Sequence, residues 1–237
     1  MAGSVVLVHG LRTSSTMWRA QRELLEARGI TVITLDLPGH GTRMSERFTL
    51  DGAMRTIDEA VRSTPGPVLL VGFSLGGYLS IHYAGSQPQP IAALLAASCG
   101  TRPHRLILWG WRGLAAVIHR FPDRGLLLNN TLLKLFVRDP QLVDDVLAGG
   151  VALEVMDDVL RELRPLAIRD SLAHIPQPVT LVNGRLDHFR LQERRYLRAT
   201  INGRLVHIAG ATHLVSLTQP ARFDDVLLDA VAGAGVA

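Results

Sequence analysis

The chain has 237 residues, of which 47% are hydrophobic and 19% charged, and its formal net charge is +4. This length suits one domain with an embedded insertion, and the composition excludes an extensively disordered protein. The basic residues are almost all arginines scattered from Arg12 to Arg222, without interleaved aromatics on one segment. We therefore expect no nucleic-acid partner.

The single cysteine, Cys99, excludes an intramolecular disulfide, and no other ligand cluster predicts a metal site. The first ten residues carry no basic leader, and their apolar run is too short for a signal peptide core or a membrane span. We expect a cytoplasmic protein that needs neither a metal nor a cofactor. The sequence gives no indication of the oligomeric state.

Short runs rich in Val, Ile and Leu alternate with segments of helix length, which is typical of a parallel sheet with crossover helices. We predict an α/β fold with a doubly wound, mostly parallel sheet of six buried strands, at residues 5–8, 32–35, 68–71, 92–97, 179–182 and 204–208.

The helices between these strands have recognisable ends. Ser14 or Ser15 can cap a first helix over residues 16–28, which Gly29 would stop. Thr49 can cap a second helix that runs to residue 62, and a third follows over residues 74–85. Pro220 suits the first turn of a closing helix that ends near residue 231.

Residues 101–169 break this alternation, because they contain no convincing strand. We interpret them as a helical cap inserted into a core formed by residues 1–100 and 170–237, with helices at 104–121, 126–137, 140–147 and 151–163. The first cap helix is apolar almost all round, apart from a narrow basic stripe formed by Arg105, Arg112 and His119/Arg120. Two acidic pairs, Asp144/Asp145 and Asp157/Asp158, are expected on the outer faces of the cap.

The strongest local signal is the segment Gly72-Phe-Ser74-Leu-Gly76, where a buried strand turns sharply into a helix. A serine in such a strained turn needs neighbours without side chains, because a Cβ there would collide with the adjacent strand or helix. Its hydroxyl then stands at the helix N-terminus, where developing negative charge is stabilised. Ser74 is therefore the candidate nucleophile.

A serine nucleophile needs a base and an acid that orients this base. Asp187 follows the fifth strand and His213 follows the sixth, so both are expected at the sheet edge that carries Ser74. His188 is a rival for the base and Glu193 for the acid. Other histidines are weaker candidates, and His207 lies inside a strand.

Two backbone N–H groups should stabilise the oxyanion of such a reaction. One is the amide of Leu75, directly after the nucleophile. The other is expected in the loop after the first strand, where Gly10 lets the backbone approach the substrate and Leu11 offers its N–H.

These residues resemble the α/β-hydrolase superfamily, and in particular its small, cap-bearing bacterial esterases and lipases. The matching elements are His9-Gly10, Trp18, Asp36–Gly41, Gly72–Gly76, the lead from Leu172 to Gly184 and Asp187, and Thr212-His213. The resemblance implies a triad of Ser74, Asp187 and His213, a cap that closes the pocket, and a structural turn at residues 36–41. The chain starts near the strand that is third in the usual fold, so two leading strands are expected to be missing.

The first cap helix suggests the kind of substrate. Its apolar residues would line the pocket with hydrocarbon and favour an apolar acyl or alcohol part: Leu106, Ile107, Leu108, Trp109, Trp111, Leu114 and Ile118. Trp109, Trp111, Gly10 and Leu214 are the predicted substrate contacts. The same helix could instead pack within the cap, or touch a lipid surface transiently.

We therefore expect hydrolysis of a carboxylic ester or thioester through an acyl-enzyme on Ser74. The same triad could also cleave carbon–carbon bonds, act as a lyase or support a peroxide-dependent halogenation. A non-enzymatic relative that senses a ligand is a further alternative. Epoxide or haloalkane cleavage is disfavoured, because those reactions need an aspartate in place of Ser74.

Overall fold

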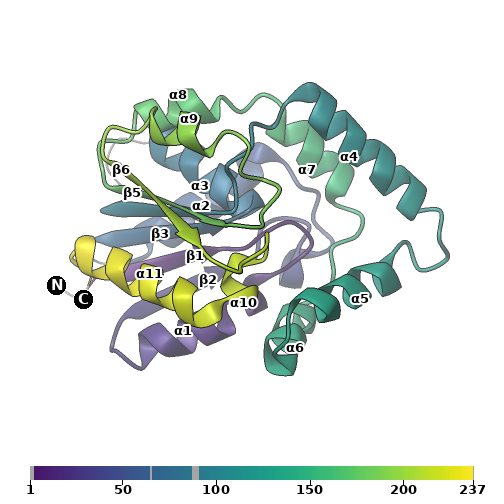
Figure 1. Cartoon of the computed structure of the whole chain (residues 1–237), viewed down its shortest axis with the longest axis horizontal. Coiled ribbons are helices and arrows are strands. Elements are labelled where there is room, and N and C mark those ends of the chain that lie inside the picture. The colour runs from purple at the N-terminus through teal and green to yellow at the C-terminus, as the bar shows by residue number, and fades with distance from the viewer. Residues whose placement is uncertain (1–2, 65, 87–90, 237) are drawn as a thin grey trace.

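The computed structural model describes residues 3–64, 66–86 and 91–236, and within them a parallel sheet of six strands forms the centre of the molecule (Figure 1). The strand order is β2-β1-β3-β4-β5-β6, and every neighbouring pair is parallel. The strands are β1 (Ser4–Val8), β2 (Thr31–Leu35), β3 (Val68–Phe73), β4 (Ala93–Ala97), β5 (Val179–Gly184) and β6 (Gly203–Ile208). The predicted α/β sheet is confirmed.

The prediction that all six strands are buried is wrong for the two edge strands. Every residue of β1, β3, β4 and β5 is buried, whereas β2 and β6 are mostly half-buried or exposed. An edge strand has a neighbour on one side only, so part of its surface stays in solvent. The hydrophobic composition of residues 32–35 did not indicate that this strand lies at the edge of the sheet.

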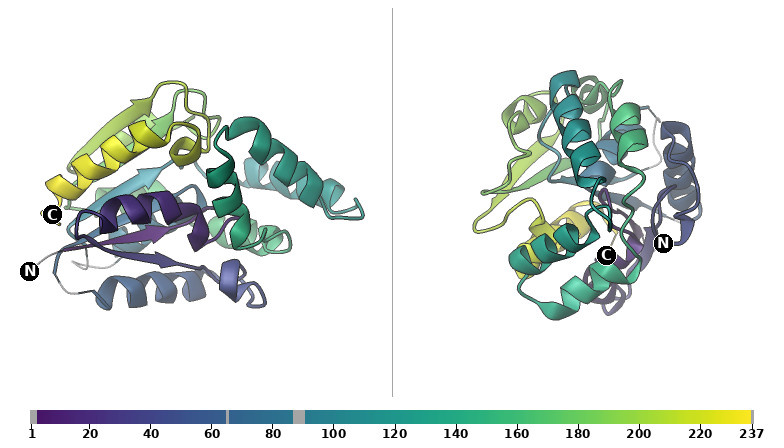
Figure 2. Two further views of the ribbon diagram at one scale, coloured as in Figure 1. Left: turned by 90° about the horizontal axis from the view of Figure 1, so that it is seen from below. Right: turned by 90° about the vertical axis from the view of Figure 1, so that its right-hand side faces the viewer.

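Helices cover both faces of the sheet (Figures 1 and 2). Alternate residues of β1 point to opposite faces, so Val6 and Val8 join one hydrophobic cluster while Val5 and Leu7 join the other. The first cluster lies under α2 (Leu50–Arg62), α3 (Leu75–Ser86), α8 (Ile168–Ala173) and α9 (Glu193–Leu197). The second lies under α1 (Arg19–Glu26), α10 (Val215–Thr218) and α11 (Pro220–Gly233).

The helix ends follow the predicted caps with one change. Ser14 accepts a hydrogen bond from Thr16 N–H, but it starts a 3₁₀ helix, η1 (Ser15–Trp18), before α1 begins. Thr49 accepts one from Gly52 N–H at the start of α2, and Pro220 occupies the first turn of α11. A second 3₁₀ turn, η2 (Gly41–Arg43), follows β2.

Helices α4 (Arg105–Ile118), α5 (Leu126–Phe136), α6 (Pro140–Ala148) and α7 (Met156–Leu163) lie between β4 and β5 in the chain, and we call them the insertion. Figure 1 shows them at the right of the molecule, with α4 beside α7 and α5 beside α6. Helix α7 starts five residues later than expected. Helix α8 spans the expected boundary at residues 169 and 170 and packs on α3 in the core.

The insertion carries fewer free charges than its sequence suggests. Asp145, expected on an outer face, is buried and forms an ion pair with Arg19 at 3.1 Å. In the basic stripe, Arg112 is paired with Asp157 at 2.5 Å, and the side chain of Arg105 lies outside the described residues. Where the structure is described, it contains no helix with the length and apolar character needed to cross a membrane.

Candidate active site

Ser74 sits in a left-handed turn between β3 and α3, with φ at +50°. The glycines around it have almost no room for a side chain: a Cβ on Gly72 would lie 2.3 Å from Gly76 O, and one on Gly76 would lie 2.3 Å from Val8 O. Strain at a non-glycine residue persists only where the surrounding packing enforces it. The turn thus holds the serine hydroxyl clear of the sheet at the start of α3.

Three side chains from separate loops meet at the carboxyl edge of the sheet. His213 Nε2 lies 3.0 Å from Ser74 Oγ, and His213 Nδ1 lies 3.1 Å from Asp187 Oδ1. With Nδ1–H donating to the carboxylate, neutral His213 presents Nε2 as the acceptor of the serine proton. Ser74, Asp187 and His213 are therefore brought together in the expected order.

The carboxyl of Asp187 is kept ionised by its contacts. Burial alone would raise its pKa, but the hydrogen bond and charge of His213 and the N–H of Phe189 lower that pKa below its ordinary value. Asp187 Oδ1 accepts the Phe189 N–H at 2.8 Å as well as the histidine N–H. A fixed carboxylate of this kind can orient an imidazole.

The rival residues have other partners. The His188 ring is centred 5.5 Å from that of His213, and burial and the neighbouring His213 lower the pKa of His188. Glu193 is buried, where it accepts hydrogen bonds from Asn183 at 2.9 Å and pairs with His207 at 2.9 Å. Neither rival is hydrogen-bonded to Ser74 within the described part of the chain.

Ser98 is a contributor that sequence reasoning missed. It follows β4 with φ at +54°, and its hydroxyl donates to the backbone carbonyl of His213 at 2.7 Å. Its position after a strand, at the edge shared by Ser74, was the signal available in the sequence. The contact ties the histidine loop to β4.

Leu11 and Leu75 both border the pocket beside Ser74. Leu75 is the first residue of α3, where an amide has no partner in a preceding helical turn. Gly10, a predicted substrate contact, is instead buried outside the lining, and a Cβ there would lie 2.7 Å from the Phe73 ring. Its glycine serves close packing rather than contact with a substrate.

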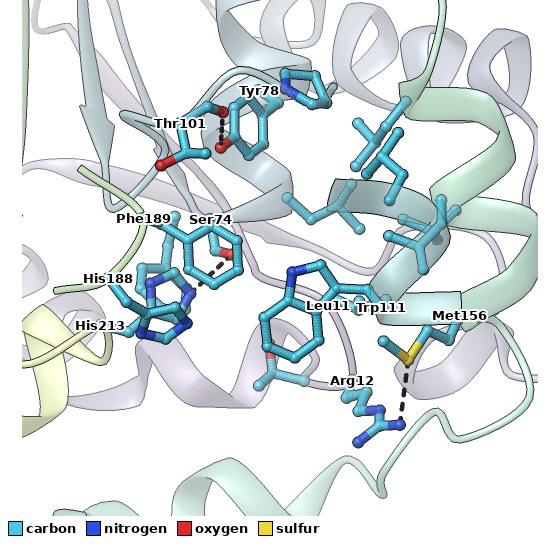
Figure 3. Close-up of a pocket in the computed structure, with 18 of the residues that line it drawn as sticks. Leu11, Arg12, Ser74, Tyr78, Thr101, Trp111, Met156, His188, Phe189 and His213 are labelled. Atoms are coloured by element: carbon cyan, nitrogen blue, oxygen red, sulfur yellow. Dashed lines mark hydrogen bonds between the residues drawn. The ribbon is translucent and has the colours of Figure 1, made fainter. Parts of the chain in front are cut away.

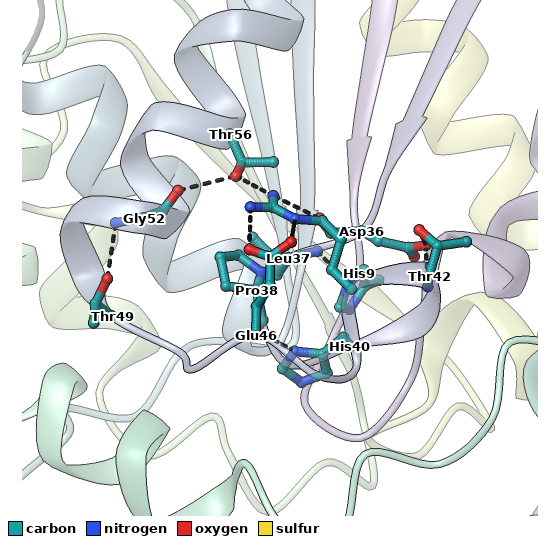
Figure 4. Close-up of polar contacts among 11 residues, drawn as sticks. His9, Asp36, Leu37, Pro38, His40, Thr42, Glu46, Thr49, Gly52 and Thr56 are labelled. Atoms are coloured by element: carbon teal, nitrogen blue, oxygen red, sulfur yellow. Dashed lines mark hydrogen bonds and ion pairs between the residues drawn. The ribbon is translucent and has the colours of Figure 1, made fainter.

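Polar contacts connect His9, in the loop that also carries Leu11, and Asp36 with the segments around them (Figure 4). His9 Nδ1–H donates to Gly10 O at 2.8 Å, and its Nε2 accepts the Leu37 N–H at 3.0 Å. Complete burial and the neighbouring His40 lower the pKa of His9 to about 3, so its ring is neutral. Asp36 accepts the Ser15 N–H at 2.7 Å, which ties the same loop to the strand end of β2.

Ser74 and His213 open into a cavity of about 300 Å³ (Figure 3). This volume lies at the lower end of the range for small-molecule sites. The walls are mostly hydrocarbon and come from the end of β3, from α3, α4 and α7, and from loops of the core: Leu11, Phe73, Leu75, Tyr78, Leu108, Trp111, Met156, Val159, Leu160, Leu163, Phe189 and Leu214. The residues of α7 were not predicted, although their spacing marks one face of an amphipathic helix.

The structure divides the predicted contacts of α4. Trp111 lines the cavity and stacks on Phe189 with ring centres 5.7 Å apart, and Leu108 also lines it. Trp109, predicted as a substrate contact, is 74% exposed and absent from the lining, so that prediction is wrong. Trp109 and Trp111 are two positions apart, which corresponds to about 200° around a helix, so their indoles lie on opposite faces. The side chains of Leu106 and Ile107 lie outside the described residues.

Among the residues that the structure describes, no group of three or more His, Cys, Asp or Glu side chains is placed to hold a metal ion. Cys99 is buried with no disulfide partner. The site therefore offers a serine, a histidine and a carboxylate in an apolar cavity as its reactive groups.

Residues 5–226 match the alpha/beta hydrolase family. The chain is 31% identical to a pimeloyl-[acyl-carrier protein] methyl ester esterase from Methylococcus capsulatus, over 92% of this chain and 90% of that protein. It is 28% identical to the protein of the same name from Yersinia pestis, over 95% and 92% of the two chains. The structure of a hydrolase from Pseudomonas aeruginosa superposes with a TM-score of 0.80 at 20% identity, covering 97% of this chain and 90% of that one.

Proposed function

The chain belongs to the alpha/beta hydrolase family, and on that premise we propose that it cleaves a carboxylic ester with Ser74 as the nucleophile. The observation that carries the proposal is the contact of Ser74 Oγ with His213 Nε2, 3.0 Å apart at the floor of an apolar cavity. Cleavage of esters agrees with the relatives named methyl ester esterases. These relatives favour ester cleavage over carbon–carbon cleavage, a lyase reaction or ligand sensing.

In the first half of the reaction, His213 Nε2 takes the proton of Ser74 as Oγ attacks the ester carbonyl. The carbonyl oxygen becomes an oxyanion, which the N–H groups of Leu11 and Leu75 stabilise. As the carbon–oxygen bond to the alcohol breaks, the imidazolium returns its proton to the leaving oxygen. The products are an acyl-enzyme on Ser74 and a free alcohol.

Water completes the cycle by the same route. His213 removes a proton from water as the water oxygen attacks the acyl carbon, and it then protonates Ser74 Oγ when the acyl–serine bond breaks. Asp187 keeps Nδ1 of His213 protonated and stabilises the imidazolium in both halves. The reaction proposed here uses no group beyond those of the chain, the ester and water.

We propose a methyl or other small alkyl ester of an acyl chain as the substrate class, as in the relatives' name. The hydrocarbon walls formed by α4 and α7 suit the methylene groups of such a chain, since burying each one contributes about 0.8 kcal/mol. A thioester would fit the same cavity.

Hydrolysis of 4-nitrophenyl esters from acetate to palmitate tests this function. We expect turnover that rises from acetate to a medium acyl chain, and loss of nearly all turnover in Ser74→Ala with an unchanged unfolding transition. Retained activity in Ser74→Ala would contradict the mechanism. A sharp preference for acetate would contradict the acyl-chain assignment.

We further propose a transient contact of the insertion with lipid surfaces. Large apolar side chains are exposed on α4 and α5, among them Trp109, Leu127 and Leu135 at 74%, 73% and 69%. Nearby arginines such as Arg112 and Arg124 are already paired with acidic residues, so apolar burial rather than charge would drive the contact.

Sedimentation with phosphatidylcholine vesicles tests this contact. We expect binding by the wild type that is weakened in Trp109→Ser combined with Leu127→Ser. Equal sedimentation of both proteins would contradict the lipid contact without affecting the ester hydrolase assignment.

A further inference from the structure

Arg12 is a charged side chain in the wall of a mostly apolar cavity. It follows Leu11 in the loop after β1, and it borders the same cavity as Ser74 and His213. Its φ is +67°, a left-handed conformation that is unfavourable for a residue with a side chain. Figure 3 shows it on the side of the cavity formed by Leu11, Trp111 and Met156.

In the part of the chain that the structure describes, no acidic side chain forms an ion pair with the guanidinium of Arg12. Within the described residues, its Nη2 donates a hydrogen bond to the Met156 sulfur at 3.2 Å, and sulfur is a weak acceptor. The Arg12 Nε is buried and has no hydrogen-bond partner in the same part of the chain.

The acidic residues within two positions of Met156 in the sequence pair with other arginines, and Glu154 pairs with Arg124. Asp157 pairs with Arg112 at 2.5 Å and with Arg161 at 2.6 Å. Asp158 pairs with Arg47 at 3.2 Å and with Arg161 at 3.3 Å. No carboxylate of the described residues therefore reaches Arg12 in an ion pair.

An arginine in this setting is costly unless an anion joins it. Burial lowers the pKa of Arg12 from its ordinary value, but a guanidinium stays protonated in proteins. Arg12 is half-buried, and its buried Nε–H without a partner and its charge without a counter-charge both work against the stability of the structure. A guanidinium presents its N–H groups in a planar fork that matches a carboxylate or a phosphate.

We propose that Arg12 is an anion subsite of the substrate cavity, which binds an oxyanion group carried by the ester at the far end of its hydrocarbon chain. The inference rests on the proposed ester hydrolysis at Ser74 and specifies its substrate: an ester with an apolar middle and a carboxylate or phosphate beyond it. The apolar walls hold the methylene groups, and the unsatisfied N–H groups of Arg12 bind the anion.

Matched methyl esters of one chain length test this subsite: methyl octanoate, the monomethyl ester of suberic acid, and a methyl ester ending in a phosphate. The measured quantity is kcat/KM for each charged ester divided by kcat/KM for the neutral one. In the wild type we expect this ratio to exceed one for the carboxylate, the phosphate or both, and the preferred ester identifies the anion. A ratio of one or less for both charged esters would overturn the proposal.

Two variants assign the effect to Arg12. Arg12→Met should lower the ratio about tenfold or more, because a hydrogen bond to a charged group is lost, and Arg12→Lys should restore part of it. Arg102→Met is the matched comparison, since Arg102 borders the same cavity but is exposed. If the ratio falls in Arg102→Met and not in Arg12→Met, the assignment to Arg12 is wrong.

Calorimetric binding separates this subsite from the catalytic proposal. Ser74→Ala should bind at least one of the two charged esters, the carboxylate or the phosphate, more tightly than methyl octanoate, and adding Arg12→Met to it should remove the difference. If the wild type cleaves none of the esters but this binding difference holds, the ester hydrolase assignment fails and the subsite stands. If the esters are cleaved but bind equally, the subsite fails alone.

Discussion

Substituting Gly76 by alanine should disrupt the turn that holds Ser74. The new Cβ would lie 2.3 Å from Val8 O and 2.6 Å from His9 O, and both are backbone atoms that cannot rotate away. Forcing an extra carbon into close-packed structure costs about 1–3 kcal/mol, and the short distances here place Gly76→Ala at about 3 kcal/mol. The same displacement moves the neighbouring serine away from His213.

Two measurements test this prediction. Urea unfolding gives the free energy of unfolding, and labelling of the native protein with a fluorophosphonate probe reports on Ser74. Gly113→Ala is the matched control, because Gly113 lies inside α4 and a Cβ there would have no described atom within 4 Å beyond its own stretch of helix. This control should gain about 0.5–1 kcal/mol, since alanine favours a helix interior. Wild-type stability and labelling in Gly76→Ala would refute the packing argument.

Three further predictions concern the site and its support. Asp187→Asn should lower kcat for a 4-nitrophenyl ester by about 10⁴-fold with little loss of stability, because His213 loses its orienting acceptor; a loss below tenfold would speak against that role. Because burial lowers the pKa of His9 to about 3, the unfolded chain takes up a proton below about pH 6.5 that the native protein does not. The free energy of unfolding should therefore fall as the pH drops from about 6.5 toward 3, by up to about 1.4 kcal/mol per pH unit from this residue. In His9→Asn, the free energy of unfolding measured with urea should differ less between pH 7 and pH 5 than it does in the wild type. Trp111→Ala should raise KM for a medium-chain ester roughly tenfold through loss of wall area, whereas Trp109→Ala should leave KM for the dissolved ester unchanged; equal effects would contradict the division of α4.

The arrangement of Ser74, Asp187 and His213 could be predicted because each of them lies at a strand end that the sequence marks clearly. The glycines around Ser74 and the short apolar runs before Asp187 and His213 fix both the parallel sheet and the edge where the loops converge. The order of the three residues along the chain then suggested Asp187 as the acid and His213 as the base.

The features that escaped prediction depend on contacts between distant segments. Helix α4 is apolar on most sides, so its sequence did not indicate whether Trp109 or Trp111 faces the cavity. Asp145 looked like a surface residue because its partner, Arg19, lies 126 positions away. The bond from Ser98 to the His213 carbonyl likewise joins segments that only the folded sheet brings together.

The central claim is that Ser74 is the nucleophile of a working triad. Intact-mass measurement after incubation with a fluorophosphonate probe tests it most directly, with proteolysis to locate the adduct. We predict one adduct per chain, on the peptide that contains Ser74, and none in Ser74→Ala. An unlabelled wild type, or an adduct that persists in Ser74→Ala, would contradict the assignment.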